Sequence, residues 1–544
     1  MKRALWMKRT LWMKRALWMK RALCLLAAIL PLTAQVSYDR LRQAESEPGN
    51  WLTYSGNYSS HRYSGLSRIT AANVARLRPA WVYQIRSTDR VETSPLVVDG
   101  IMYLSEPGGS VTALDTLTGR PLWKYVRTLP KTVRGCCGPM NRGVAILGDM
   151  IYVSTYDAHV VALDMKSGIV RWDTEVADPK LGHSMTAAPL ALKDKIVVGM
   201  AGGEYGVRGF IDAYDAKSGK RAWRFWTVPA AGEPGSETWA GDTAKTGAAA
   251  TWVTGSYDPD QNTVFWGTGN PGPDWNGDTR IGDNLYSDCL VALDGDTGKL
   301  KWYFQFTPHD VHDWDATEVP VLVDAVVRGE KRKVVLFGNR NAFYYVLDRT
   351  SGKFLAGRQF AKQSWARGLD DSGRPIMLPN SSPTTEGQKV YPDLGGGTNW
   401  FSPSFSPVAN LFFVAARDSG AIYLKGNAEY KPGAQFNGGG QSPIEGEDPI
   451  GVIRALKPDT GELQWEFKLH SDAGAGLLST AGNVVFTGTN EGDFLALDAP
   501  TGRLLWHFQT GAVIKANPVS YLSGGKQQVA IAAGNSIFAF TLDE

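Results

Sequence analysis

The chain has 544 residues, 43% of them hydrophobic, and a formal net charge of +3. This length fits two to four ordinary domains or one large repeat architecture, and the composition is that of a globular protein with a large core. Residues 1–34 carry eight Lys and Arg and no Asp or Glu, so residues 35–544 have a net charge of −5. Nucleic-acid binding therefore has no support, because a binding surface for nucleic acid would need excess positive charge.

The first 34 residues have the pattern of an export signal. Met-Lys-Arg-Ala-Leu-Trp opens the chain and recurs three times nearly unchanged, and an apolar run over 22–32 follows. A basic region, a short apolar region and a small residue are typical of a secretory signal peptide, and the run is too short to span a bilayer. We expect a signal peptide over 1–34, one domain over 35–544 and location in the periplasm.

Seven copies of a short pattern follow. Each has an apolar pair, usually an aspartate, a glycine four residues later and, in most copies, a tryptophan four residues after that. The glycines are Gly119, Gly168, Gly219, Gly298, Gly352, Gly461 and Gly502. The fifth copy lacks the tryptophan, and the sixth has Lys457 in place of the aspartate. The pattern predicts a strand, a tight turn with glycine at positive φ, and a second strand whose tryptophan packs between neighbouring sheets.

The spacing of the copies predicts a propeller. Most copies are about 40 to 55 residues apart, which fits four-stranded blades. Residues 81–85 near the start and 537–540 at the end would complete an eighth blade. We therefore predict an all-β, eight-bladed β-propeller with tryptophan-docking repeats. Two longer gaps, 223–292 and 352–455, predict loops inserted on the face that carries function.

Two segments carry unusual chemistry. Residues 308–318 contain three aspartates, a glutamate, two histidines and a tryptophan between two predicted strands. A solvated acidic loop would explain them, whereas buried charges would need partners or a metal. Cys136 and Cys137 are adjacent, with Cα atoms about 3.8 Å apart, so a bond between them would be strained. Strain of this kind persists mainly at functional sites. The alternative to a disulfide is that the two cysteines are free or metal-bound thiols.

Five motifs, in this order, resemble those of pyrroloquinoline quinone (PQQ)-dependent alcohol dehydrogenases of the methanol/ethanol type. They are RGCCGPMNRG (134–143), GGEYGVRG (202–209), WGTGNPGP (266–273), TPHDVHD (307–313) and NRN (339–341). The resemblance extends over essentially all of residues 35–544. It implies a disulfide between Cys136 and Cys137 under one face of PQQ and stacking of Trp252 on the other. The other implied cofactor contacts are Glu92, Arg142, Thr155, Gly202, Gly203, Arg340, Asn399 and Trp400.

The resemblance also implies the roles in catalysis. Glu204 and Asn270 match the metal ligands, and both offer the oxygen that hard cations require. Asp313 matches the general base, with Arg340 holding developing negative charge. A neighbouring cation is expected to keep Asp313 ionised. His309 and His312 are interpreted as loop structure rather than as rival bases.

Asp315 bears on the choice of metal. Lanthanide-dependent members of the family carry an aspartate two residues after the base, and calcium members usually carry a small uncharged residue there. Alternation along an extended segment would put Asp313 and Asp315 on one side, where both could face the ion. The sequence therefore favours one lanthanide ion, with Ca²⁺ beside a surface aspartate as the alternative.

Departures from the family pattern concern the substrate. Where methanol enzymes carry a second large tryptophan, residues 473–476 read Ala-Gly-Ala-Gly, and Ala250 replaces a threonine. Less bulk predicts a larger pocket and makes methanol doubtful as the preferred small alcohol. No Cys-x-x-Cys-His occurs, so no haem is expected in the chain and electrons would pass to a separate periplasmic cytochrome c.

The leading hypothesis is a periplasmic quinoprotein alcohol dehydrogenase that forms aldehydes by hydride transfer to metal-bound PQQ. One alternative is a calcium-dependent PQQ dehydrogenase for secondary or sugar alcohols. Another is a non-enzymatic propeller scaffold, since the repeat alone gives no activity. A homodimer is compatible with the sequence, which does not fix the oligomeric state.

Overall fold

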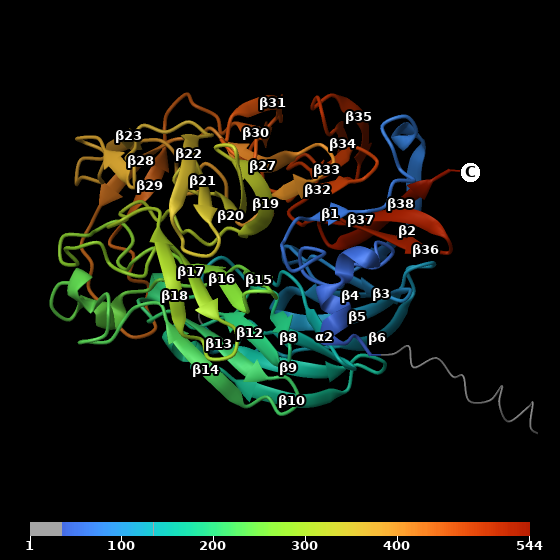
Figure 1. The fold of residues 1–544 in the computed structure, drawn as a ribbon. Helices are drawn as coiled ribbons and strands as arrows, with labels where there is room; N and C mark the ends of the chain where they lie inside the picture. Colours follow the sequence, from blue (N-terminus) through green and yellow to red (C-terminus); the bar gives the residue numbers. More distant parts are fainter. Residues whose placement is uncertain (1–34, 134, 544) are drawn as a thin grey trace, which may run out of the picture.

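Strands account for nearly all regular structure in the computed structural model, which describes residues 35–133 and 135–543 (Figure 1). The predicted signal peptide and Arg134 lie outside the described residues. The single α-helix of the described part, α2 (Tyr38–Arg42), is one short segment near its start. No helix among these residues is long and apolar enough to cross a membrane. The predicted all-β class is therefore confirmed.

Eight sheets of four or five strands form the body of the described chain. The first four, in hydrogen-bonded order, are β3 (Leu96–Val98), β4 (Ile101–Glu106), β5 (Ser110–Asp115), β6 (Pro121–Tyr125); β7 (Ala145–Leu147), β8 (Met150–Ser154), β9 (His159–Asp164), β10 (Val170–Glu175); β11 (Leu190–Leu192), β12 (Lys195–Gly199), β13 (Phe210–Asp215), β14 (Arg221–Trp226); and β15 (Ser256–Asp258), β16 (Thr263–Gly267), β17 (Cys289–Asp294), β18 (Leu300–Gln305).

The other four sheets, again in hydrogen-bonded order, are β19 (Val321–Val327), β20 (Glu330–Gly338), β21 (Phe343–Asp348), β22 (Phe354–Gln359); β26 (Ser404–Ser406), β27 (Leu411–Arg417), β30 (Gly451–Leu456), β31 (Leu463–Lys468); β1 (Tyr63–Ser64), β32 (Leu478–Thr480), β33 (Val484–Gly488), β34 (Asp493–Asp498), β35 (Leu504–Gln509); and β2 (Leu77–Gln84), β38 (Ser536–Leu542), β37 (Lys526–Ala533), β36 (Val519–Ser523). Two small sheets come from the long gap after β22: β23 (Ala366–Leu369) with β24 (Pro375–Met377), and β25 (Gln388–Val390), β28 (Ala421–Lys425), β29 (Gly439–Pro443).

The repeated turn forms as the sequence predicts. In all seven copies the glycine has a φ between 69° and 73°, a left-handed conformation that other residues adopt at a cost. In the first copy, Asp115 Oδ1 accepts a hydrogen bond from the backbone N of Thr118 (2.8 Å). The turn is therefore held by a local side-chain bond and by the one residue without a Cβ.

Among the described residues, six tryptophans dock on the turn of the next sheet, and Trp506 of the last copy is not one of them. Trp81 Nε1 donates to Thr116 O at 2.8 Å, and Trp123 Nε1 donates to Met165 O at 3.1 Å. The same bond recurs for the other docking residues, at Trp172, Trp223, Trp302 and Trp465. The rings lie against the repeat glycines, where a Cβ would collide with them. The docked indoles thus join one sheet to the next.

The copy without a tryptophan uses a tyrosine instead. Tyr344 on β21 lies against Gly461, and its hydroxyl donates to Pro458 O at 2.9 Å. Tyrosine offers a flat ring and a polar donor, the two properties that docking requires. The missing tryptophan therefore does not interrupt the series of contacts between sheets.

The two ends of the described chain share one sheet. β2 pairs with β38 antiparallel, with Trp81 opposite Ala539 and Tyr83 opposite Ile537. The predicted pairing of residues 81–85 with 537–540 is confirmed. Trp506 on β35 also packs against Phe540 on β38, with ring centroids 5.4 Å apart.

Candidate functional site

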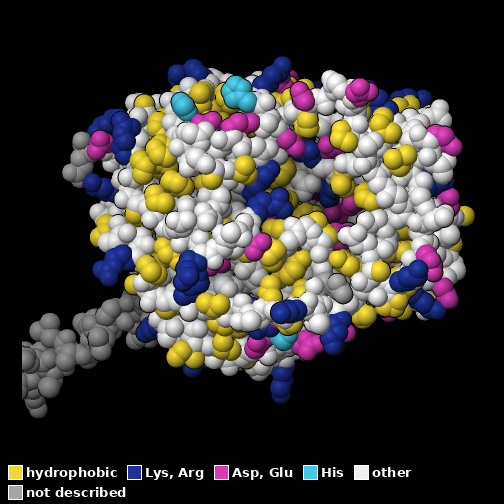
Figure 2. Space-filling model, turned by 180° about the vertical axis from the view of Figure 1, so that it is seen from behind, with side chains coloured by type: hydrophobic (Ala, Val, Ile, Leu, Met, Phe, Trp, Pro, Cys, Tyr) yellow, Lys and Arg dark blue, Asp and Glu magenta, His cyan; other side chains and the backbone are white. Residues whose placement is uncertain are grey.

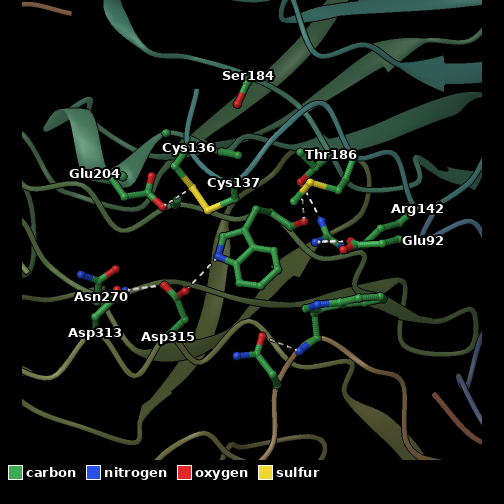
Figure 3. Close-up of a pocket in the computed structure, with 18 of the residues that line it drawn as sticks. Glu92, Cys136, Cys137, Arg142, Ser184, Thr186, Glu204, Asn270, Asp313 and Asp315 are labelled. Carbon is green, nitrogen blue, oxygen red and sulfur yellow. Dashed lines mark hydrogen bonds and ion pairs between the residues drawn. A yellow bond between two sulfur atoms is a disulfide. The ribbon is translucent and has the colours of Figure 1, made fainter. Parts of the chain in front are cut away.

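Fourteen of the fifteen predicted site residues line one cavity of about 250 Å³ (Figure 3). They are Glu92, Cys136, Cys137, Arg142, Gly202, Gly203, Glu204, Trp252, Asn270, Asp313, Asp315, Arg340, Asn399 and Trp400. The two long gaps in the repeat supply several of them, as the sequence predicted. Residues more than 300 positions apart in the chain are thus brought to one place.

Thr155 is the exception. It is fully buried in the turn between β8 and β9, where its Oγ1 donates to Asp157 Oδ1 at 2.6 Å and accepts from the backbone N of His159. The predicted contact of Thr155 with the cofactor therefore needs correction, because this hydroxyl is committed to its own turn. Thr186 lines the cavity instead, and its Oγ1 accepts a hydrogen bond from Arg142 Nη1 at 2.8 Å.

The cavity wall uses one position of the repeat several times. Glu92, Thr186, Trp252 and Trp400 are each the fourth residue before the first strand of a sheet, namely β3, β11, β15 and β26. First strands of neighbouring sheets contact one another, as β7 and β11 or β26 and β32 do. The segment entering each first strand therefore reaches the shared centre. The position four residues before a first strand is therefore the feature that would have identified Thr186, rather than Thr155, as the threonine of the cavity wall.

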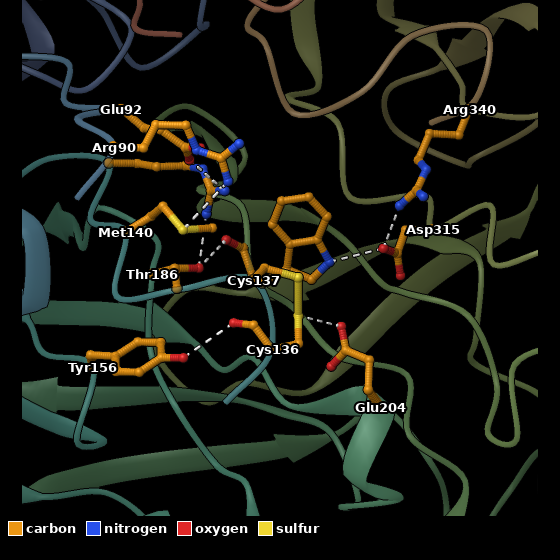
Figure 4. Close-up of a disulfide and its surroundings, with 12 residues drawn as sticks. Arg90, Glu92, Cys136, Cys137, Met140, Tyr156, Thr186, Glu204, Asp315 and Arg340 are labelled. Carbon is orange, nitrogen blue, oxygen red and sulfur yellow. Dashed lines mark hydrogen bonds and ion pairs between the residues drawn. A yellow bond between two sulfur atoms is a disulfide. The ribbon is translucent and has the colours of Figure 1, made fainter. Parts of the chain in front are cut away.

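Cys136 and Cys137 form the predicted disulfide in the cavity wall (Figure 4). Cys136 Sγ lies 2.9 Å from Glu204 Oε1, and the hydroxyl of Tyr156 donates to Cys136 O at 3.1 Å. Cys289 is buried and free, and burial raises the pKa of its thiol well above the usual value. The disulfide therefore belongs to the cavity, whereas Cys289 belongs to the core.

Flat rings and a guanidinium form another part of the wall. The Arg142 guanidinium carbon lies 4.9 Å from the Trp252 ring centre and 4.6 Å from that of Trp400, within the range of cation–π attraction. Arg142 Nη2 also pairs with Glu92 Oε2 at 2.8 Å. These contacts fix the two indoles and leave flat apolar surface beside a cation.

Asp315 is the centre of the polar contacts at the other end of the cavity. Its Oδ2 accepts from Trp252 Nε1 at 3.0 Å and pairs with Arg340 Nη1 at 2.6 Å, and its Oδ1 accepts from the backbone N of Asn270 at 2.9 Å. Each carboxylate oxygen keeps further acceptor capacity. Asp315 thus orients the stacking indole and two other predicted site residues.

Asp274 is a residue that the sequence analysis did not single out. It is buried, and its Oδ1 accepts a hydrogen bond from Asn270 Nδ2 at 2.9 Å. Because the amide nitrogen is held there, the amide oxygen of Asn270 remains as its free acceptor. Asp274 therefore adds a carboxylate and orients a predicted metal ligand.

The carboxylates raise one another's pKa. Burial, followed by Asp315, raises the pKa of Glu204 to about 7. Burial and then Asp274 raise the pKa of Asp313 well above its usual value, and Arg340 only partly opposes them. Arg340 alone does not outweigh burial and like charges, so the expectation that a neighbouring cation keeps Asp313 ionised stays a prediction for the metal-bound protein.

This donor set fits a hard cation. Three carboxylates that line the cavity, those of Glu204, Asp313 and Asp315, and the amide oxygen of Asn270 are the kinds of ligand that calcium-like ions prefer, and a bound cation would offset the repulsion among the carboxylates. In the described chain, the one group of three or more His, Cys, Asp or Glu side chains with ligand atoms all within 4.8 Å of one another is Cys136, Cys137 and Glu204. Two of its members form a disulfide, which is not a thiolate ligand. The oxygen donors, rather than the sulfurs, are therefore the group suited to a metal.

Two family descriptions match the chain. Residues 51–359 match "Glucose/ethanol/alcohol dehydrogenase, beta-propeller domain", and residues 450–543 match "Outer membrane protein assembly factor BamB". Among curated proteins, the chain is 39% identical to quinoprotein alcohol dehydrogenase PedH of Pseudomonas putida, over 92% of this chain and 89% of that one. It is 36% identical to a lanthanide-dependent methanol dehydrogenase of Methylacidiphilum fumariolicum, over 91% and 86%.

Solved structures agree with these matches. The quinohemoprotein alcohol dehydrogenase of Comamonas testosteroni superposes with a TM-score of 0.90 and 33% identity, covering 94% of this chain and 83% of that chain. A europium-containing methanol dehydrogenase superposes with a TM-score of 0.88 and 32% identity, covering 93% and 100%. The similarity thus includes both the fold and the sequence.

Proposed function

Since this chain belongs to the PQQ-dependent alcohol dehydrogenase family, we propose that it oxidises a small alcohol to an aldehyde in the cavity described above. The observation that carries the proposal is the assembly of the disulfide, the Trp252 ring, cationic side chains and a carboxylate cluster around one cavity. When bound, PQQ would accept the two electrons of the alcohol, and the metal would polarise it as a Lewis acid.

The residues present fit a flat, anionic cofactor. The disulfide and Trp252 offer flat surfaces, and Arg142 offers a guanidinium suited to carboxylates. Arg142 Nε and Arg340 Nε are buried donors without a hydrogen-bond partner among the residues described. Unpaired buried donors are costly, so a ligand that supplies acceptors would relieve them. We assign cofactor binding to these residues together with Glu92, Thr186, Gly202, Gly203, Asn399 and Trp400.

We assign the metal to Glu204, Asn270, Asp313 and Asp315. Asp315 adds a carboxylate that balances the third charge of a lanthanide, which supports a lanthanide ion over Ca²⁺. Asp274 adds more negative charge to the same end of the cavity and favours the same choice. A calcium enzyme acting on secondary or sugar alcohols would need no such excess of carboxylates.

Asp313 would take the proton of the alcohol hydroxyl. A general base must be ionised, and in the protein alone burial and Asp274 oppose that state. A cation held by its neighbours would lower the pKa of Asp313 and make it a base. Arg340, buried beside Asp315, would hold negative charge that develops as the proton leaves.

The surroundings of the enzyme are proposed from the sequence. The signal-peptide pattern supports a periplasmic location, and the absence of a haem-attachment motif supports a separate cytochrome c as electron acceptor. For the fold, we propose that the eight sheets are the blades of a closed propeller. The chain of docked rings, the shared sheet of β2 and β38, and the Trp506–Phe540 contact support closure.

Reconstitution tests the proposal. The purified protein is loaded with PQQ and either La³⁺ or Ca²⁺, and alcohol-dependent dye reduction is followed. We expect activity with La³⁺, loss of at least 10²-fold in Asp313→Asn, and retention in Asp278→Asn, an exposed control. Activity with Ca²⁺ alone would exclude the lanthanide assignment. A protein that shows no quinone absorbance after PQQ addition would favour a scaffold.

A further inference from the structure

Lys515 carries an ammonium group behind the cavity wall, within electrostatic range of the lining residues Arg90 and Glu92. The residue is half-buried in the segment before β36. Within residues 35–133 and 135–543, no hydrogen bond or ion pair reaches its Nζ. No carboxylate forms an ion pair with this ammonium group at contact distance, so part of its hydration is lost without a direct replacement.

Lys515 stands at the repeat position that lines the cavity in four other sheets. It is the fourth residue before the first strand of its sheet, as Glu92, Thr186, Trp252 and Trp400 are of theirs. The sheet of β36 neighbours the sheet of β3, because Trp81 of the former docks on the turn of the latter. Lys515 is therefore the neighbour of Glu92 around the centre.

The same register explains what fills the space at Gly474. This glycine is the fourth residue before β32, and a Cβ built on it would lie 2.2 Å from Lys515 Nζ. A Cβ on Gly476 would meet Asn517 Oδ1 at 1.8 Å. The expectation that residues 473–476 simply enlarge the pocket needs correction, because polar side chains from the next sheet occupy that space.

The carboxylates near Lys515 are already paired with arginines. Glu92 Oε1 pairs with Arg90 Nε at 3.0 Å and Glu92 Oε2 with Arg142 Nη2 at 2.8 Å. Asp472 pairs with Arg417 at 2.6 Å.

Burial lowers the pKa of Lys515, with Arg90 and Arg417 acting in the same direction and Asp472 and Glu92 opposing them. Arg90 and Arg142 therefore both pair with Glu92, and Lys515 adds a third cation within electrostatic range of this carboxylate. This end of the cavity has an excess of positive charge.

We propose that Lys515 and Arg90 form a carboxylate-binding subsite at the cationic end of the cavity. Arg90 lines the cavity, is half exposed and offers a planar fork, whereas Lys515 offers a point charge. The carboxylate has two sources within the proposed function, on which this inference rests. It belongs to the cofactor, or it belongs to a substrate that carries a hydroxyl at one end and a carboxylate at the other.

Lys515→Met tests the subsite in the full-length protein. Lys299→Met, an exposed lysine on another sheet, is the matched control, and Lys515→Arg keeps the charge. Two quantities are measured: the Kd for PQQ, from quenching of tryptophan fluorescence, and the ratio of kcat/KM for 4-hydroxybutanoate to that for butan-1-ol. Because Lys515 would form a charge-assisted hydrogen bond with the carboxylate, we expect Lys515→Met to weaken PQQ binding or to lower the substrate ratio by roughly tenfold or more.

The outcomes separate the two sources. A higher Kd for PQQ with an unchanged substrate ratio assigns the carboxylate to the cofactor. An unchanged Kd with a ratio that falls about tenfold assigns it to the substrate, and Lys515→Arg should recover most of either loss. Kd and ratio both equal to those of Lys299→Met would overturn the subsite.

A failure of the proposed function is distinguishable from a failure of the subsite. If the wild-type protein binds no PQQ, the proposed function and the cofactor source are both excluded. Calorimetry of 4-hydroxybutanoate binding to wild type and to Lys515→Met then decides the substrate source without any turnover. Equal heats and affinities in the two proteins would overturn that source as well.

Discussion

Removal of the Asp315 carboxylate should destabilise the protein before any cofactor or metal is bound. Asp315 and Arg340 form a pair at 2.6 Å, with side chains only 8% and 5% exposed. In Asp315→Ala, Arg340 loses the one carboxylate with which it forms an ion pair and keeps only the more distant charges of Asp313 and Glu318; breaking a buried pair typically costs about 3–5 kcal/mol. Trp252 Nε1 and the backbone N of Asn270 also lose their acceptor. Because Arg340 still donates to Leu394 O, we expect about 3 kcal/mol.

Urea unfolding of the cofactor-free protein measures this loss. Asp278→Ala is the control, since Asp278 is 64% exposed and pairs with Lys425 at 2.9 Å, so it should cost less than about 1 kcal/mol. The double variant Asp315→Ala with Arg340→Met should cost about 2 kcal/mol less than the sum of the single variants, because neither charge remains. Equal effects of Asp315→Ala and Asp278→Ala, or strict additivity, would refute the buried pair.

Three further predictions address the fold, the cofactor and the metal. Gly352→Ala puts a Cβ 2.5 Å from the Trp302 ring at a φ of 73°. The free energy of unfolding in urea should therefore fall by roughly 2–4 kcal/mol. An unchanged urea midpoint would contradict the docking of Trp302 on this turn. Thr186→Val should weaken PQQ binding about tenfold in a fluorescence titration. Thr155→Val should lower the stability of the protein and leave the Kd for PQQ unchanged. The reverse pattern would restore Thr155 as the threonine that contacts the cofactor. Because the pKa of Glu204 is raised to about 7, its proton stabilises the metal-free protein below about pH 4.5, and that stabilisation is lost as the pH rises to about 7. Terbium affinity, read from sensitised luminescence, should rise by up to roughly tenfold per pH unit over the same interval, and a flat profile would contradict the raised pKa.

Local requirements made much of the fold predictable. A glycine at positive φ and a docking tryptophan recur at fixed spacing because most of the sheets pack on their neighbours in the same way, so the pattern is visible in the chain itself. Tyr344 shows the limit of that approach. Tyr344 lies two residues before Val346, the first residue of the fifth copy, whereas the tryptophans of the pattern come after the glycine. Only its packing against Gly461 shows that Tyr344 docks.

Site residues that stand in a recognisable motif were predictable from the sequence, whereas those selected by the packing of the sheets were less so. Cys136, Cys137 and Glu204 stand in glycine-rich segments, which bring backbone close to a ligand and are recognisable without a structure. The choice between Thr155 and Thr186 depended on which segment enters an innermost strand, which is a property of the assembled sheets. The raised pKa of Asp313 likewise depends on burial and on Asp274, a contact between parts of the chain that sequence alone does not pair.

The two ends of the cavity carry opposite charge, and this opposition explains why its residues act as one site. Figure 3 shows Glu204, Asn270, Asp313 and Asp315 on one side of the disulfide and Arg142 with Glu92 on the other. A ligand with carboxylates at one end and metal-chelating oxygens at the other would neutralise both ends at once, together with a metal ion. Either end alone would leave buried charge uncompensated, which is expensive in a low dielectric. Metal and cofactor should therefore bind cooperatively, each raising the affinity for the other, and titration of PQQ with and without La³⁺ measures that coupling directly. Equal PQQ affinities in the two titrations would show that the ends act independently.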